Sequence, residues 1–241
     1  MSVTKATQVP DVFLKWSHKV GPIRCIYDCG SRDATDGLSL LTELDADELH
    51  AFECNPEALE LCKNNISLDV NRAKVHLVPC ALAETSGVLK FHSIDPTRTI
   101  TSHPDGNIGA SSLYRANPEY PHEHYVQKTI DVTAISLDEY SVTHTLPDLL
   151  WMDLQGAEAR VLDGAKNILP RVKIIHVEVS FRRMYIDQAL FRDVHLRLRK
   201  NFRLVWTNLG RWPSFPRIYS ALRFGPWLGN AIYVNKTIST R

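Results

Sequence analysis

The sequence predicts an α/β protein in which a mostly parallel β-sheet is covered by helices on both faces. Short apolar runs recur along the chain, and most are followed by a segment with helical periodicity. Strands that alternate with helices in this way are typical of a parallel sheet, because both of its faces are buried. The chain has 241 residues, 44% of them hydrophobic, which is enough for one well-buried domain and short for two.

The first part of the chain supplies strands and two helices. Asp36 is placed to cap the first helix, whose leucines fall on one face. Asn55 is placed to cap the second helix, and Pro56 occupies its first position. The predicted strands are CIYDCG (25–30), ELHAFE (48–53) and KVHLVPCAL (74–82), with GVLKFHS (87–93) as a short extended piece.

The later part of the chain begins with an irregular tract, residues 93–128. A tract of this length without periodicity is usually functional or disordered, so we expect it to select the substrate. The pattern then resumes with the strand LPDLLWMDLQ, the helix GAEARVLDGAKNIL, the strand KIIHVEVS, the helix DQALFRDVHLRLRK, and the strands FRLVW and NAIYVN. We expect one domain over residues 1–241, with 1–22 as an N-terminal cap segment and 93–128 and 208–229 as substrate-binding insertions.

Charge and composition argue against several classes of partner. The formal net charge is +1, so no overall field attracts nucleic acid or an anionic membrane surface. No stretch has the apolar length of a signal peptide core or a membrane span, and we expect a cytoplasmic protein. The five cysteines include no C-x-x-C pair, so we expect reduced, buried thiols rather than a zinc site.

The stretch YDCGSRDATDG, residues 27–37, is a candidate cofactor-binding turn. Gly30 ends the first strand, where an open α/β sheet can bring a ligand close to its backbone. Glu53 ends the next strand, 53 − 30 = 23 residues later, and its two oxygens suit a ribose diol. The alternative is that Glu53 only caps the following helix. Together, the glycine turn and the carboxylate favour a cofactor with an adenosine part.

The residues also bear on the kind of cofactor. No tyrosine has a lysine four positions later, as a short-chain nicotinamide enzyme needs, and no G-x-x-x-x-G-K-[ST] loop is present. Asp28, at the entry to the loop, suits a cofactor with a positively charged end. S-adenosylmethionine, with its sulfonium and amino groups, fits this requirement. An NAD(P)-dependent oxidoreductase or epimerase is the alternative.

Several blocks of the chain resemble the FkbM family of S-adenosylmethionine-dependent methyltransferases. The similarity runs in family order from about residue 24 to residue 180. Two positions differ from the usual pattern: Asp33 and Ala34 stand where a small residue or glycine is common, and Trp151 stands where lysine is frequent. The matching blocks are IYDCGSRDATDG, HAFECNPEALELCKNNI, PCALAETSGVLKFH, GASSL, ISLDEY, DLLWMDLQGAEARVLDGAKNIL and IIHVEVS.

The resemblance implies a Rossmann-like methyltransferase fold with a mostly parallel seven-stranded sheet. It also implies cofactor contacts, with the methionine end near Gly30, the ribose at Glu53 and the adenine at the end of the third strand. The implied cofactor-binding residues are Asp28, Gly30, Ser31, Arg32, Glu53, Asn55, Cys80, Ala81 and Asp153.

Candidate catalytic residues follow the later strands. A carboxylate that ends a buried strand is costly unless it is paired, which favours a site role for Asp153 and, similarly, Glu178. Glu158 is a third candidate, although it could instead compensate the dipole of its own helix. Asp153 and Glu178 could also hold Mg²⁺, but no third ligand is evident, so no metal is predicted. The candidate substrate-binding residues are Ser111, Ser112, Tyr114 and Gln155.

The sequence therefore predicts a methyltransferase that acts on a hydroxyl group of a small polar molecule, such as a sugar or a natural product. Its partner is expected to be this small-molecule acceptor, with neither nucleic acid nor membrane, while assembly into a homo-oligomer stays open. Two alternatives are the nicotinamide-dependent enzyme and a non-catalytic scaffold of the same fold. Cofactor binding and turnover separate the three.

Overall fold

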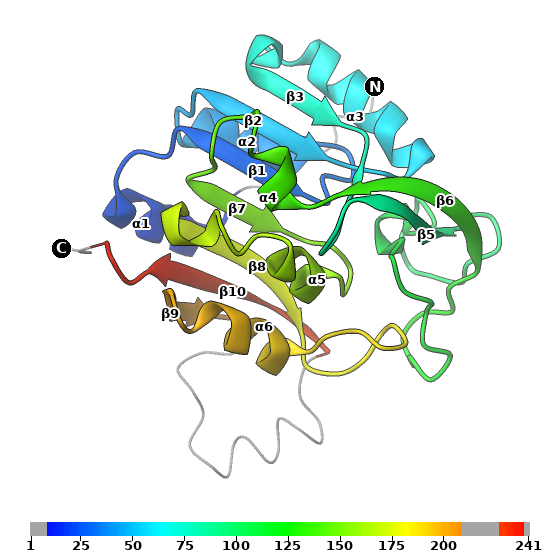
Figure 1. Ribbon diagram of the computed structural model, residues 1–241. Coiled ribbons are helices and arrows are strands. Elements are labelled where there is room, and N and C mark those ends of the chain that lie inside the picture. Colours follow the sequence, from blue (N-terminus) through cyan, green and yellow to red (C-terminus); the bar gives the residue numbers. More distant parts are fainter. Residues whose placement is uncertain (1–8, 209–226, 239–241) are drawn as a thin grey trace.

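The computed structural model describes residues 9–208 and 227–238 and contains a central seven-stranded sheet (Figure 1). The strand order is β3-β2-β1-β7-β8-β10-β9. Neighbours from β3 to β8 pair in parallel, whereas β10 is antiparallel to β8 and β9, so the predicted sheet is confirmed. The strands are β1 (Cys25–Cys29), β2 (Glu48–Phe52), β3 (Val75–Val78), β7 (Leu149–Met152), β8 (Ile174–Ser180), β9 (Phe202–Thr207) and β10 (Leu228–Asn235).

Helices cover both faces of this sheet and make three layers. Successive strand residues point to opposite faces, so Ile26 belongs to one core cluster and Tyr27 to the other. The first face is covered by α1 (Asp11–Val20), α2 (Thr35–Glu43) and α3 (Pro56–Leu68). The second is covered by α4 (Leu137–Tyr140), α5 (Glu158–Asp163) and α6 (Phe191–Leu198). Short 3-10 turns are η1 (Arg72–Lys74), η2 (Ile108–Ala110) and η3 (Leu169–Arg171).

A second, three-stranded sheet was not predicted. It has the order β4-β6-β5 and consists of β4 (Ala81–Leu82), β5 (Gly87–Ile94) and β6 (Gln127–Ile135). Residues 127–135 carried a usable signal, because buried Val132 and Ala134 alternate with exposed Asp131 and Thr133. This sheet frames the irregular tract, so residues 93–128 begin and end in β5 and β6 and contain η2 between them.

Three predicted elements are shorter or divided. The predicted strand 74–82 breaks at Pro79, which has no N–H for a ladder, so its two parts join different sheets. The helix predicted from residue 156 ends at Asp163, and Gly164 follows at the C-cap, where a Cβ would lie only 2.3 Å from the Ala83 carbonyl oxygen. The segment before α6 is a turn instead, in which buried Gln188 binds the backbone amides of Met184 and Tyr185.

The helix starts are only partly as predicted. Asn55 caps α3, with its side chain accepting the amide of Glu57 and Pro56 at the first position. By contrast, Asp36 lies in the first turn of α2, and the cap position is Ala34 in a left-handed conformation. The tight turn at residues 30–34 determines where α2 begins, so the preference of Asp36 for the cap position does not determine it.

The segment expected as an N-terminal cap contains α1, which packs across β8 and β10. Phe13 of this helix is fully buried, and its ring meets Trp151 at a centroid distance of 5.2 Å. Trp151 also stacks on His176 at 3.7 Å. Trp151, where relatives often carry lysine, is therefore part of the core beneath α1.

The candidate insertion 208–229 lies largely outside the described residues, which resume at Trp227. Within the described ranges, no helix combines the length and apolar character needed to cross a lipid bilayer.

Candidate functional site

The candidate site lies where the direction of winding of the sheet reverses. The chain adds β2 and β3 on one side of β1, then returns to place β7 on the other side. The carboxyl ends of β1 and β7 thus form the switch point at which open α/β sheets bind ligands. Gly30 follows β1 with φ +89°, and a Cβ there would lie 2.0 Å from the Asp153 carbonyl oxygen. No larger residue fits this close approach of the two strand ends.

The loop after Gly30 is tightly wound. Arg32 and Ala34 adopt left-handed conformations, with φ of 55° and 64°, which glycine would tolerate more easily. The chain makes this turn with Arg32 and Ala34 and without a second glycine. Asp28 is buried below the loop and accepts a hydrogen bond from Ser31 Oγ at 2.7 Å. Burial raises the pKa of Asp28 to about 7.

Glu53 is held in place by backbone amides. Its Oε1 accepts the N–H groups of Cys54 and Asn55, both at 2.7 Å, and its Oε2 accepts the N–H of Arg32 at 2.9 Å. Burial raises its pKa, while these three bonds oppose the shift. The helix cap is supplied by Asn55, so the carboxylate of Glu53 instead joins the end of β2 to the glycine loop.

A cavity of about 600 Å³ opens above these strand ends. One part is largely apolar and is lined by Ala58, Leu82, Phe91 and Ala157, together with Cys54 and Cys80. This volume is in the range usual for small-molecule sites. The predicted residues that line the cavity are Gly30, Arg32, Glu53, Asn55, Cys80, Ala81, Ser111, Asp153, Gln155 and Glu178.

The other part of the cavity holds an acidic pair, Asp153 after β7 and Glu178 on β8. The two carboxyl groups are hydrogen-bonded to each other. Burial, followed by the charge of Asp153, raises the pKa of Glu178 well above its usual range, so Glu178 is the member that more readily holds a proton. Burial also raises the pKa of Asp153. Asp153 is exposed to solvent through the open cavity, although many protein atoms lie around its carboxyl group.

Gln155 positions this pair. Its Nε2 donates to Asp153 Oδ1 at 2.6 Å and to Glu178 Oε2 at 3.3 Å, and its Oε1 accepts the Tyr185 hydroxyl at 3.0 Å. The backbone of Gln155 is left-handed, with φ 50°, and its carbonyl oxygen accepts a hydrogen bond from Ser112 Oγ at 2.8 Å. The turn is therefore held from both sides, and the acidic pair is fixed with it.

Some predicted site residues do not reach the cavity wall among the described residues. Glu158 is buried, and its Oε1 accepts the amides of Leu154 and Gly156, so it serves the turn rather than an acceptor molecule. Ser112 supports the turn from outside, and Tyr114 lies beside Arg160. Asp28 and Ser31 lie beneath the glycine loop. These five residues are not among those that line the cavity, and their predicted roles in the site stay predictions.

The irregular tract was expected to contact the acceptor, through His122 among others, but most of its other cavity residues were not predicted individually. Glu123 is the centre of a network: its carboxylate accepts hydrogen bonds from Thr101, Tyr125 and Asn107, and it pairs with His103. A second contact joins the tract to the glycine loop through an ion pair of Arg32 with Asp105. The aromatic spacing of Tyr120 and Tyr125 was a visible signal, but periodicity could not show which way these side chains point. The cavity wall contributed by the tract includes Ser102, His103, Asn107, Tyr120, His122, Glu123 and Tyr125.

The chain is similar in sequence to a curated methyltransferase. The chain is 29% identical over 189 residues to 2-O-methyltransferase NoeI of Sinorhizobium fredii (strain NBRC 101917 / NGR234). The alignment covers 76% of this chain and 74% of that protein.

Among solved structures, the fold is similar to an FkbM methyltransferase from Methylobacillus flagellatus KT, with a TM-score of 0.49 and 12% identity. The match covers 88% of this chain but only 43% of the other, so this chain spans less than half of that longer protein. A precorrin-6y C5,15-methyltransferase from Geobacter metallireducens GS-15 has a TM-score of 0.47 and 12% identity, with coverages of 98% and 94%. Neither structure carries the family assignment.

The assignment comes from the sequence profile described as the methyltransferase FkbM domain, which matches residues 28–204. The matched region includes the glycine loop, Glu53, the acidic pair and Gln155, all of which contribute to the cavity. Because it extends over well more than half of the 241 residues, the chain belongs to the FkbM methyltransferase family.

Proposed function

We propose that this chain transfers the methyl group of S-adenosylmethionine to a hydroxyl group of a small polar acceptor, such as a sugar or a natural product. The observation that carries the proposal is the single cavity that joins the amide-held Glu53 to the hydrogen-bonded pair Asp153–Glu178. Family membership supports methyl transfer, and the name of the relative NoeI supports oxygen as the accepting atom.

The cofactor end of the cavity fits the cofactor chemically. Gly30 leaves the strand end without a side chain, so the backbone can approach a ligand closely. A carboxylate has about four lone-pair directions, and three backbone amides use three of those of Glu53. The remaining direction, on Oε2, can accept a ribose hydroxyl. The apolar wall near Ala81 and Leu82 suits the face of an adenine ring.

The acidic end of the cavity fits an acceptor that must lose a proton. When bound, the cofactor supplies an electrophilic methyl group on a positively charged sulfur, which becomes a neutral thioether after transfer. Asp153 takes the hydroxyl proton, since its raised pKa makes it a stronger base than an ordinary aspartate. Glu178 keeps its own proton and donates to Asp153, and Gln155 holds both groups in place. Much of the remaining acceleration comes from positioning.

The wall of the cavity beyond the acidic pair indicates the class of acceptor. Tyr120 and Tyr125 line it together with Glu123 and His103, so aromatic faces alternate with hydrogen-bonding groups. Such a surface can stack on the apolar face of a ring while it binds several hydroxyl groups. This pattern supports a polyhydroxylated ring as the acceptor. These side chains of the tract are therefore offered for the acceptor, while the polar groups of Ser111 and Gln155 at the cavity are engaged by other protein groups.

The first test is calorimetric titration with S-adenosylhomocysteine, with NAD⁺ in a parallel titration. We expect saturable binding of S-adenosylhomocysteine alone, followed by methylation of hydroxylated acceptors in a screen with labelled cofactor. Binding of NAD⁺ alone would support the nicotinamide enzyme. Binding of neither compound would support a non-catalytic scaffold.

Two variants distinguish a proton-sharing pair from an Mg²⁺ site made of the same carboxyl groups. We expect Asp153→Asn to lower turnover about 10²- to 10⁴-fold, because the base is lost. Glu178→Gln should change turnover much less, because the amide reproduces a neutral donor. Both variants should still bind S-adenosylhomocysteine. Equal loss in the two variants, together with loss of wild-type activity in EDTA, would assign the pair to a metal instead.

The location of the protein in the cell is also part of this proposal. A cytoplasmic protein that acts on a small molecule agrees with the net charge of +1 and with the use of a soluble cofactor. Fractionation of cells that produce the protein at its natural level would test the location.

A further inference from the structure

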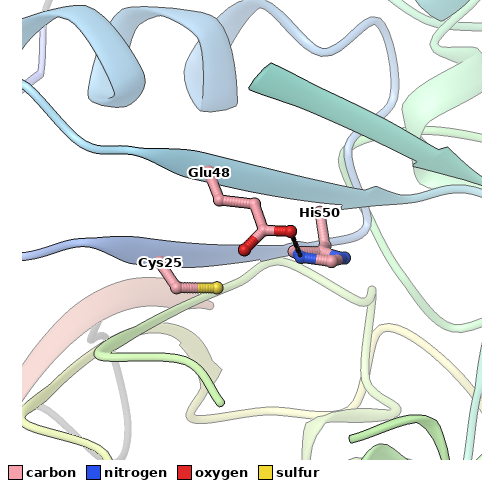
Figure 2. Close-up of side chains that lie close together, drawn as sticks. All are labelled: Cys25, Glu48 and His50. Carbon is pink, nitrogen blue, oxygen red and sulfur yellow. Dashed lines mark ion pairs between the residues drawn. The ribbon is translucent and has the colours of Figure 1, made fainter. Parts of the chain in front are cut away.

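A second cluster of polar side chains lies at the opposite end of the same strands, away from the cavity. Cys25 begins β1, and Glu48 and His50 lie on β2. The register pairs Cys25 with Glu48, and alternation along β2 brings His50 to the same face. Figure 2 shows the three side chains turned toward one another, and their ligand atoms all lie within 4.8 Å of one another.

His50 in this cluster has an unsatisfied nitrogen. Its side chain is completely buried, and Nε2 makes no hydrogen bond although Glu48 Oε1 lies 3.1 Å away. The other nitrogen, Nδ1, is 2.7 Å from the Tyr140 hydroxyl. When Nδ1 donates to that oxygen, Nε2 carries a lone pair directed toward Glu48 and Cys25. In that tautomer the Nε2 lone pair faces a carboxylate oxygen at 3.1 Å instead of a donor, and a cation bound between the two groups would stabilise this arrangement.

We propose that Cys25, Glu48 and His50 bind a divalent transition metal, with Zn²⁺ as the best match to the donor atoms. Sulfur, carboxylate oxygen and imidazole nitrogen are the ligands that zinc takes in proteins, at about 2.0–2.3 Å. A tetrahedral ion with such bonds places its donor atoms about 3.5 Å apart. The ligand atoms of the three side chains lie within 4.8 Å of one another, so the donors must draw closer together to bind the ion.

The surroundings supply a fourth donor and a route for entry. His76 of β3 is the register partner of His50, and its Nε2 also lies 3.1 Å from Glu48 Oε1. The side chain of His76 is 51% exposed and that of Glu48 is 25% exposed, so the cluster opens to solvent on this side. Tyr140 would orient the His50 ring from behind, as second-shell partners of zinc-bound histidines do.

Metal binding would change the state of Cys25. Without metal, the thiol lies 3.6 Å from the Thr145 carbonyl oxygen, to which it donates. On binding, the sulfur coordinates as a thiolate and its proton passes to solvent. The ion would tie the amino ends of β1 and β2 together, and β3 as well when His76 binds. Its role is therefore structural, and it is independent of the proposed methyl transfer.

The test uses the purified full chain, stripped of metal with a chelator and then titrated with Zn²⁺ or Co²⁺. We expect one Zn²⁺ per chain and, with Co²⁺, an ultraviolet charge-transfer band that reports a cobalt–thiolate bond. Cys25→Ala should abolish this band. Glu48→Gln, at a partly exposed position with nearly the same shape, should weaken Zn²⁺ binding at least about tenfold in a folded protein.

Cys62→Ala is the matched control, because Cys62 is also a buried thiol but lies in α3 outside the cluster. It should bind Zn²⁺ as the wild type does. Absence of stoichiometric Zn²⁺ and Co²⁺ binding by the wild type would overturn the proposal, as would unchanged binding in Glu48→Gln. Because the cluster lies away from the cavity, Glu48→Gln should leave the affinity for S-adenosylhomocysteine unchanged, so failure here is separable from failure of the proposed function.

Discussion

Replacement of Glu53 by glutamine tests the cofactor end of the site most directly. Three backbone amides use three of its lone-pair directions, which leaves one on Oε2 for a ribose hydroxyl. Glutamine has one carbonyl oxygen, so it cannot hold the amides of both Arg32 and Asn55 and also accept from the ribose. A hydrogen bond to a charged group contributes about 1.5–3 kcal/mol. We therefore expect binding of S-adenosylhomocysteine to weaken about 10- to 100-fold.

The measurement is isothermal titration with S-adenosylhomocysteine, after circular dichroism has confirmed that the variant is folded. Glu57→Gln is the matched control, because Glu57 is exposed in the first turn of α3 and does not line the cavity. It should bind like the wild type. A folded Glu53→Gln protein whose affinity matches that of the control would refute the ribose assignment, since the lost acceptor would then have had no ligand to hold.

Three further predictions follow from the geometry and the charges. Turnover should rise with pH through an apparent pKa above the ordinary aspartate range, because burial raises the pKa of Asp153 and the base must be deprotonated. A rise that is complete at the pH where an ordinary aspartate has lost its proton would contradict this prediction. Gly30→Ala should lower the free energy of unfolding by more than about 2 kcal/mol, because φ is +89° and a backbone oxygen blocks the Cβ. Gly21→Ala, with φ +86° and open space around the Cβ, should cost only the free energy of placing alanine at a positive φ. Equal chemical-denaturation midpoints for the two variants would refute this argument. Burial lowers the pKa of His176 from 6.5 to about 3, so the folded state resists its protonation and the free energy of unfolding falls as pH drops below 6.5. His176→Phe should remove about 2 kcal/mol of the stability that the wild type loses between pH 8 and pH 5. An unchanged pH dependence of stability would argue against a neutral, buried His176.

Much of the fold could be predicted from local patterns. The runs at 25–30 and 48–53 are strands because their short length and mostly apolar composition suit burial on both faces. Asn55 followed by proline marked a helix start, since capping depends only on neighbouring residues. The need for glycine at position 164 was harder to predict, because the backbone that leaves no room for a Cβ there belongs to Ala83, which is far away in the chain.

The candidate site shows the same division. The spacing of Gly30 and Glu53 pointed to a cofactor end, because two successive parallel strands must end at the same edge of the sheet. Spacing could not distinguish Glu158 from Asp153 as an acid facing the cavity, because both follow the same buried strand. The turn decides: the left-handed Gln155 leaves Asp153 facing the cavity and folds Glu158 back onto the amides of Leu154 and Gly156.

Chain periodicity and short-range spacing therefore determine the strands, the helices and the edge of the sheet at which a ligand would lie, since each depends on residues a few positions apart. Tertiary structure alone decides the hydrogen bond between Asp153 and Glu178, the tethering of Arg32 by Asp105, and the meeting of Cys25 with Glu48 and His50. The physical reason is that proton affinity and ligand geometry depend on burial and on partners that the register of the sheet brings together from distant parts of the chain.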